Sequence, residues 1–171
     1  SAYTAERVHA LYGRTAHITP LAAAPWAVPP NPDEISRVNA TYGLPDRFAL
    51  QVGTVEPRKL TSLLVAAARD TSTPLVLAGL GSERLTSPGV LGLGHVPASD
   101  LPALFAAATV TTYLTAYEGF GLPPLEAMAC GAAVVASAIA PLTEVLGDAA
   151  RLVPNRLESL SAALVELRQD H

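Results

Sequence analysis

Two glutamates eight positions apart, Glu118 and Glu126, bracket a loop that is interrupted by Gly119 and Gly121. The glycines let the backbone approach a ligand closely and adopt positive φ angles without strain. A double proline follows the loop, and proline is favoured in the first turn of a helix because its missing N–H has no intrahelical partner there. The start of such a helix presents free N–H groups and a partial positive charge, which suit a phosphate. The segment therefore predicts a site for a phosphorylated, polyhydroxylated ligand.

A second charged motif, Gly-Thr-Val-Glu-Pro-Arg-Lys, occupies residues 53–59 and follows a short apolar run. It introduces a helical segment, so Arg58 and Lys59 are expected where a phosphate would sit. Each charge-assisted hydrogen bond to a diphosphate contributes about 1.5–3 kcal/mol. The same motif is compatible with an ordinary helix-initiating turn that carries two solvated basic residues, and by itself it does not decide between the two.

Apolar runs and helical segments alternate along the chain and must position these motifs. We predict strands over residues 48–52, 75–78, 90–93, 110–114, 133–137 and 151–153, and helices over residues 60–69, 100–108, 125–130, 142–146 and 157–169, with Asp100 as a helix cap. This alternation predicts an α/β protein with a Rossmann-like parallel sheet of about six strands and helices on both faces. Ligands of such sheets bind beyond the carboxyl ends of the strands. Gly53, Gly79, Gly94 and the Glu118 loop all fall at those ends.

Residues 1–41 are a different kind of sequence. A helix over 5–12 and a short strand over 18–21 are expected there, and four prolines, Pro25, Pro29, Pro30 and Pro32, then mark an extended stretch before a helix over 34–42. A proline-dense stretch is typical of a semi-rigid linker. We therefore expect residues 1–41 to form an N-terminal helix and interdomain connector, residues 42–171 to form the ligand-binding domain, and the chain to be the second half of something larger.

Composition excludes several classes of function. Half of the residues are apolar and only 15% are charged, which excludes disorder. The net charge of −4 gives no reason to expect a nucleic acid or an anionic membrane as partner. The single cysteine, Cys130, lies in Ala-Met-Ala-Cys-Gly and is expected to be a small buried hydrophobe rather than a nucleophile. The histidines at positions 9, 17, 95 and 171 lack ligand spacing, so no metal site is predicted.

Two stretches, residues 101–117 and 127–143, each lack charge for 17 residues, just short of a membrane span. Proline, glycine and a run of threonines divide them, so each is interpreted as a helix and a strand buried back to back. The chain does not begin with the basic and then apolar pattern of a signal peptide. The expectation is a soluble, cytoplasmic protein.

The segment from Glu118 to Glu126 resembles the E-x7-E signature of retaining glycosyltransferases with the GT-B fold, the "glycosyl transferases group 1" family that includes sucrose and glycogen synthases. Residues 53–59 resemble that family's G-x-x-E-P-R-K-N segment, and the likeness runs from about Tyr42 to Asp170. Leu60 stands where the family usually has asparagine, which removes a hydrogen bond at the start of a helix. The resemblance implies that residues 42–171 are the nucleotide-sugar-binding domain of such an enzyme.

The resemblance also implies residue roles. Arg58 and Lys59 would contact the donor diphosphate and, with Glu118, would form the catalytic set, whereas Glu126 would hold the vicinal ribose hydroxyls. The turn at Val96 would lie near the base, and the loop from Glu118 to Leu122 would face the donor sugar and phosphates. The implied donor-binding residues are Gly53, Arg58, Lys59, Val96, Glu118, Gly119, Phe120, Gly121, Leu122 and Glu126.

The implied reaction is transfer of a hexosyl group with retention, through a same-face displacement assisted by the leaving phosphate. It would need no metal or other cofactor, because basic residues and a helix end neutralise the charge. The acceptor would bind an N-terminal domain missing from this chain, and any peripheral membrane contact would be made through that domain. A stand-alone nucleotide or nucleotide-sugar binding module without catalysis remains an alternative.

Overall fold

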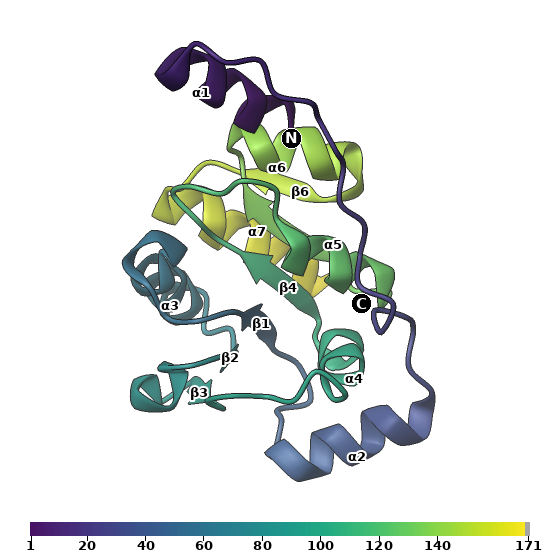
Figure 1. The fold of residues 1–171 in the computed structure, drawn as a ribbon. Helices are drawn as coiled ribbons and strands as arrows, with labels where there is room; N and C mark the ends of the chain where they lie inside the picture. Colours follow the sequence, from purple (N-terminus) through teal and green to yellow (C-terminus); the bar gives the residue numbers. More distant parts are fainter. Residues whose placement is uncertain (170–171) are drawn as a thin grey trace.

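Six parallel strands form one sheet in the computed structural model, which describes residues 1–169 (Figure 1). Their order is β3-β2-β1-β4-β5-β6, and every neighbouring pair is parallel. The predicted α/β class and the predicted number of strands are confirmed. Asp170 and His171 lie outside the described residues. The strands are β1 (Ala49–Val52), β2 (Leu75–Ala78), β3 (Val90–Gly92), β4 (Val110–Tyr113), β5 (Val134–Ser137) and β6 (Arg151–Val153).

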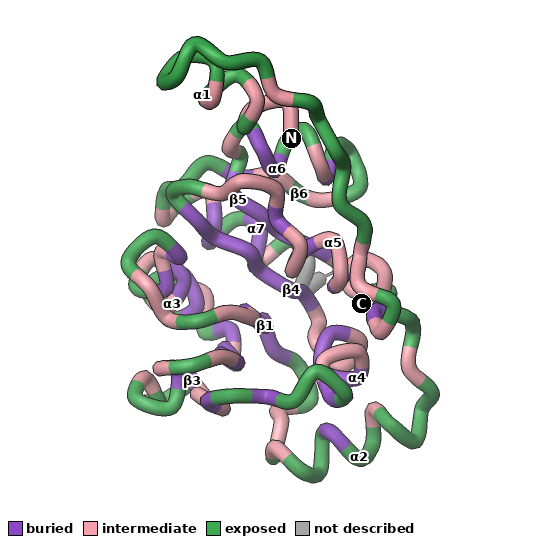
Figure 2. Tube along the Cα trace, in the orientation of Figure 1, coloured by how far each residue is buried: buried purple, intermediate pink, exposed green. Residues whose placement is uncertain are grey.

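Helices cover both faces of the sheet. On one face, α3 (Thr61–Asp70) and α7 (Leu157–Gln169) pack together over a core that includes Leu64 and Leu160. On the other face, α4 (Leu101–Ala107), α5 (Leu122–Ala129) and α6 (Ala140–Leu146) bury Phe105, Ala127 and Leu142. The four inner strands are buried along nearly their whole length because both of their faces are covered, and β2 is an unbroken apolar run. Figure 2 shows the buried segments along the strands and on the inner sides of the helices.

The N-terminal part contains two helices, α1 (Ala2–Tyr12) and α2 (Pro32–Tyr42), joined by residues 13–31 without helix or strand. In Figure 1 this connector runs from α1 past α6 and α5 to α2. The strand predicted over 18–21 is therefore wrong: Ile18 and Leu21 are 51% and 52% exposed, and an apolar run with no neighbouring strand has no ladder to join. The predicted division of the chain at residue 41 stays a prediction.

Asp100 precedes α4, but its side chain makes no capping hydrogen bond. Its backbone is helical rather than extended (φ −96°, ψ −15°), and an extended residue is what a side-chain cap needs. The carboxylate instead accepts hydrogen bonds from Arg37 and from the Tyr42 hydroxyl, both at 2.7 Å, and these bonds lower the pKa of Asp100. Asp100 is thus the N-cap residue of α4, as predicted, but its side chain ties α2 to α4 instead of capping the helix.

The two uncharged stretches fold as predicted. Residues 101–117 form α4 and β4, and residues 127–143 hold the end of α5, all of β5 and the start of α6. Within residues 1–169 no helix combines the length and the hydrophobicity needed to cross a membrane.

Candidate functional site

The two charged motifs meet where the strand order reverses. β1 lies between β2 and β4, so the chain leaves β1 toward one side of the sheet and leaves β4 toward the other, which opens a crevice at the carboxyl ends. The loop after β1 carries a 3-10 turn, η1 (Pro57–Lys59), and the loop after β4 carries Glu118. The Ala116 N–H donates to the Arg58 carbonyl at 2.7 Å and joins the two loops.

The Glu118 carboxylate is the centre of a cluster of donors. Its Oε2 accepts hydrogen bonds from the Tyr113 hydroxyl at 2.6 Å and from Lys59 Nζ at 3.1 Å. Arg58 Nη1 donates to the same oxygen at 3.2 Å, and Oε1 accepts from the Gly119 N–H at 3.0 Å. The structure therefore brings together four of the predicted site residues and adds Tyr113 to them.

These contacts fix the charge of Glu118. Burial alone would raise its pKa, but the hydrogen bonds from Tyr113, the Gly119 N–H and Lys59 outweigh burial and lower the pKa to about 2. Burial raises the pKa of Tyr113, and so does its bond to Glu118, so the hydroxyl stays protonated and able to donate. At neutral pH the cluster contains an ionised carboxylate beside a neutral phenol.

Arg58 and Lys59 have different surroundings, although the motif presents them as neighbours. The Arg58 side chain is 42% exposed and donates to Glu56 at 2.8 Å as well as to Glu118. The Lys59 side chain is 9% exposed, its Nζ lies 4.1 Å from the centre of the Tyr113 ring, and it also contacts the Tyr113 hydroxyl. Burial lowers the pKa of Lys59, and Glu118 opposes that effect. Lys59 is thus a fixed cation, whereas Arg58 reaches solvent.

The start of α5 faces the same crevice. Gly121 adopts a left-handed conformation at the helix N-cap (φ 96°), and a Cβ there would overlap the Leu142 side chain. Pro123 and Pro124 lack N–H groups, so two of the first N–H donors of the helix are absent. This helix start offers a phosphate fewer donors than the loop pattern predicted, and the two cations must supply more of the stabilisation. Leu122 begins α5 and is half-buried, as is Phe120 in the loop.

Glu126 lies one turn into α5, as predicted, and is half-buried. Burial raises the pKa of its carboxyl, and a hydrogen bond from the Ala24 N–H opposes the rise. Ala24 belongs to the connector, so the carboxylate predicted to hold ribose already binds the N-terminal part of the chain. The negative charge of Glu126 also acts on Tyr113, which places it in electrostatic reach of the Glu118 cluster.

The first helix touches the same loop. The hydroxyls of Ser1 and Thr4 donate to the Gly119 carbonyl at 2.8 and 3.2 Å. The N–H of Ala2 donates to the Glu144 carboxylate of α6 at 2.7 Å. Beside these contacts lies a cavity of about 220 Å³, lined by Tyr3, Ala116, Tyr117, Glu118, Ile139, Ala140 and Pro141. The N-terminal segment thus borders the site at two places.

Two further predicted residues lie at the strand ends. Gly53 follows β1 with φ 141°, and a Cβ on Gly79 would overlap the Gly53 carbonyl; the ends of β1 and β2 therefore pack too closely for a side chain. Val96 is 6% exposed and packs in the core on the α4 side, so only its backbone is free to face a base. The roles given to these residues remain predictions.

Sequence reasoning missed the network that supports the Glu118 loop. The Thr115 N–H donates to Ser137 Oγ at 2.8 Å, Ser137 donates to Asn155 at 2.6 Å, and Asn155 Nδ2 returns to the Thr115 carbonyl at 3.1 Å. It also missed Tyr113. The available signals were polar residues at the ends of adjacent strands and a tyrosine in a buried strand, since a buried tyrosine hydroxyl usually finds a partner.

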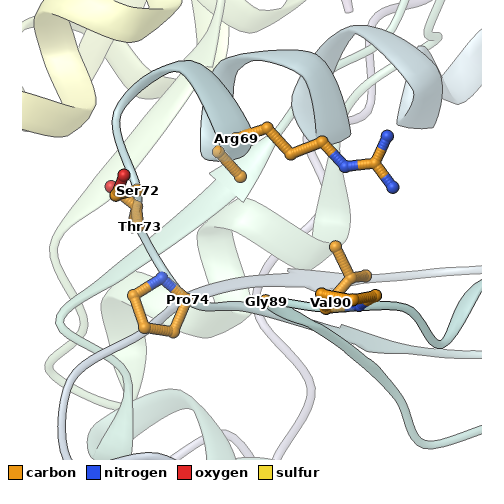
Figure 3. A pocket seen from close by; sticks show the side chains of 8 residues that line it. Arg69, Ser72, Thr73, Pro74, Gly89 and Val90 are labelled. Atoms are coloured by element: carbon orange, nitrogen blue, oxygen red, sulfur yellow. The ribbon is translucent and has the colours of Figure 1, made fainter.

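The rest of the described molecule offers weaker sites. Within residues 1–169 no three or more His, Cys, Asp or Glu side chains gather closely enough to hold a metal ion. A cavity of about 310 Å³ lies at the amino ends of β2 and β3 (Figure 3), with Arg69 on its helix side and Pro74 and Val90 on its strand side. Ligands of open parallel sheets bind at the opposite edge, and Arg69 donates to Ser87 at 3.2 Å.

Comparison with known proteins agrees with the resemblance in the motifs. A family model described as glycosyl transferases group 1 matches residues 33–170. O-antigen chain mannosyltransferase B from Escherichia coli is 40% identical in an alignment 171 positions long. The alignment covers 89% of this chain and 45% of that protein. The chain thus spans less than half the length of this curated relative.

Solved structures share the fold. Sucrose-phosphate synthase from Thermosynechococcus elongatus is 26% identical, with a TM-score of 0.76 over 96% of this chain and 47% of its own. HepE from Anabaena, solved in complex with UDP and glucose, is 23% identical, with a TM-score of 0.72 over 84% of this chain and 45% of its own.

Proposed function

The chain belongs to the glycosyl transferases group 1 family, and on that basis we propose that it binds the nucleoside-diphosphate-sugar donor of a hexosyl transfer. The observation that carries the proposal is the convergence of Arg58 and Lys59 with Glu118 in the crevice between β1 and β4. Cations suit a diphosphate, and an ionised carboxylate suits sugar hydroxyls. Relatives named as mannosyltransferases support a hexose as the transferred group.

The two cations have separate tasks in this proposal. When the bond to the anomeric carbon breaks, negative charge develops on the leaving diphosphate. Lys59 is held in place by burial and by Glu118, so it is a preorganised charge of the kind that stabilises a transition state. Arg58 is exposed and its ion pairs are weak, so it turns to the phosphates at little cost. Glu118 stays ionised, and the position on its carboxylate that Arg58 then vacates accepts a hydrogen bond from the donor sugar.

Glu126 would bind the ribose. A carboxylate has room for about four hydrogen bonds, so Glu126 can hold the Ala24 N–H and still accept two vicinal hydroxyls. Burial of its side chain strengthens those bonds by excluding water. The connector then lies beside the nucleoside, and its position is coupled to donor binding.

Transfer itself requires a second domain. The chain spans 45% of the E. coli relative, and we place the acceptor site in a domain outside it. Without a positioned acceptor the reaction loses an effective molarity that is worth as much as about 7–11 kcal/mol. We expect retention of anomeric configuration and no metal requirement. The 171-residue chain alone should bind donor weakly and transfer no sugar; glycosylated product at enzyme-like turnover would contradict this division of labour.

Titration calorimetry and thermal shift with UDP, GDP, ADP and TDP and their hexose derivatives test the proposal. HepE was solved with UDP, and the three other bases keep the panel unbiased. Ligand at about 100 times its Kd should stabilise the fold by about 2.7 kcal/mol. No heat and no melting shift with any of them at millimolar concentration would refute donor binding.

Two variants separate the proposed contacts. Arg58→Ala should weaken diphosphates about tenfold or more and spare nucleosides, because one charge-assisted bond is lost. Glu126→Ala should weaken nucleosides and nucleotides alike. Arg151→Ala is the control, since Arg151 also pairs with a glutamate, at 3.3 Å, but at the start of β6. Equal weakening of all ligands by both site variants would contradict the separate roles.

A further inference from the structure

We propose that Tyr113 is a positioning residue, whose hydroxyl and ring hold the Glu118 carboxylate and the Lys59 ammonium as one preformed unit at the donor end of the sheet. That this unit serves donor binding rests on the proposed function. Tyr113 carries none of the charges of the site and is buried at the end of β4 (3% exposed).

The tyrosine makes two kinds of contact with the same pair. Its hydroxyl donates to Glu118 Oε2 at 2.6 Å and accepts from Lys59 Nζ, so one oxygen links the carboxylate to the ammonium. Its ring lies under the ammonium at 4.1 Å, a cation–π distance. Phenylalanine would keep the second contact and lose the first, and other hydroxyl side chains would lose the ring.

The position of Tyr113 in the fold makes the unit rigid. β4 pairs with β1 and β5 on either side, and the network from Thr115 to Ser137 and Asn155 holds the chain just beyond it. The loop with Glu118 is therefore fixed at its start by the sheet and a few residues later by the tyrosine hydroxyl. A group held in this way meets the donor without reorganisation.

The hydroxyl also affects the charge of Glu118. The bond from Tyr113 opposes burial, together with the Gly119 N–H and Lys59, and helps lower the pKa of Glu118 to about 2. Arg58 pairs with the same oxygen of Glu118 and also with Glu56, and the charge of Glu126 acts on Tyr113 from α5. A titration of Glu118 therefore reports on the hydroxyl. Looser packing alone would reduce burial and lower the pKa of Glu118, whereas loss of the hydroxyl donor would raise it.

Tyr113→Phe removes only the oxygen, and Tyr42→Phe is the matched control. The Tyr42 hydroxyl also donates to a carboxylate, that of Asp100, at 2.7 Å, but between α2 and α4. Carbon-detected NMR of the 171-residue chain follows the Glu118 carboxyl from pH 1.5 to 6. We expect Tyr113→Phe to raise the pKa of Glu118 by at least about one pH unit and Tyr42→Phe to leave it unchanged. Lys59→Met, a second variant, should raise it as well.

The same variants are titrated with the tightest binder among UDP-, GDP-, ADP- and TDP-hexoses and with its free nucleoside. Tyr113→Phe should lower the affinity for the nucleotide sugar about tenfold and leave the nucleoside unaffected. An unchanged pKa of Glu118, or an unchanged affinity for the nucleotide sugar, overturns the positioning role. If no nucleotide sugar binds the unaltered chain while the carboxyl titration shifts as expected, the proposed function fails and the control of Glu118 by Tyr113 stands.

Discussion

Replacing Glu118 with glutamine should destabilise the protein at neutral pH and much less in acid. The pKa of Glu118 is about 2 in the folded protein, against an ordinary value of 4.5. This difference of about 2.5 pH units corresponds to about 3.4 kcal/mol, and solvent around the exposed fifth of the side chain reduces it to about 2–3 kcal/mol. A carboxyl with a lowered folded pKa stabilises the fold above its unfolded pKa, and this stability is lost as the pH falls through the folded pKa. The loss should therefore occur between about pH 4.5 and 2.

Urea unfolding of the unaltered chain and of Glu118→Gln at pH 7, 4 and 3 measures this difference. We expect it to be about 2–3 kcal/mol at pH 7 and less than about half of that at pH 3. Glu56→Gln is the control, because Glu56 also pairs with Arg58 but is 42% exposed; its effect should stay below about 1 kcal/mol at each pH. A Glu118→Gln difference that does not shrink in acid would refute the assignment of its stabilising contacts to the ionised form.

Three further predictions concern positions around the site. Leu60 precedes α3 at φ 49°, in the left-handed region. Asparagine tolerates this region better than alanine does, so Leu60→Asn should be more stable than Leu60→Ala by about 1 kcal/mol in urea unfolding, and equal stabilities would contradict this. Gly79→Ala should lower the free energy of unfolding by about 2–5 kcal/mol, because its Cβ would overlap the Gly53 carbonyl. Gly13→Ala, with open space around it, should lower it by about 1–2 kcal/mol. Thermal melts that rank the two variants the other way would be inconsistent with the close packing of β1 and β2. Burial raises the pKa of Cys130, which is 2% exposed, so iodoacetamide should modify it at neutral pH only as fast as the protein opens, and rapid modification of the folded chain would contradict its burial.

Much of the fold could be predicted because the signals are local. Leu75–Ala78 and Leu157–Gln169 have the predicted bounds, since a short apolar run and a long periodic one are read from neighbouring residues. Glycines and prolines likewise mark the loop after β4. The predictions failed where the structure of a segment depends on residues distant in the sequence. Residues 18–21 have no strand beside them, and the Asp100 carboxylate binds Arg37 and Tyr42 instead of the N–H groups of its own helix.

In the candidate site, too, the residues of local motifs could be predicted, whereas contacts with residues distant in sequence could not. Glu118, Arg58 and Lys59 could be found from their motifs, but Tyr113 could not be joined to them, because its neighbours are set by the order of the strands. The contact between Ala24 and Glu126 depends on the path of a connector that has no regular structure. The position of Val96 in the core likewise follows from packing on the α4 side. Local patterns therefore identified the charges, and only the tertiary structure showed what holds them.

Mapping of backbone amide shifts during titration with nucleotide sugars tests whether the donor binds in the crevice between β1 and β4. We expect saturable shifts at residues 53–59, after β1, at residues 116–122, after β4, and at Glu126, all around the crevice where the strand order reverses. Nucleosides alone should shift Glu126 and its neighbours and leave Arg58 unchanged. Shifts confined to the cavity between Ala68 and Val90, or no saturable shifts with any of the UDP-, GDP-, ADP- and TDP-hexoses, would contradict donor binding at this site.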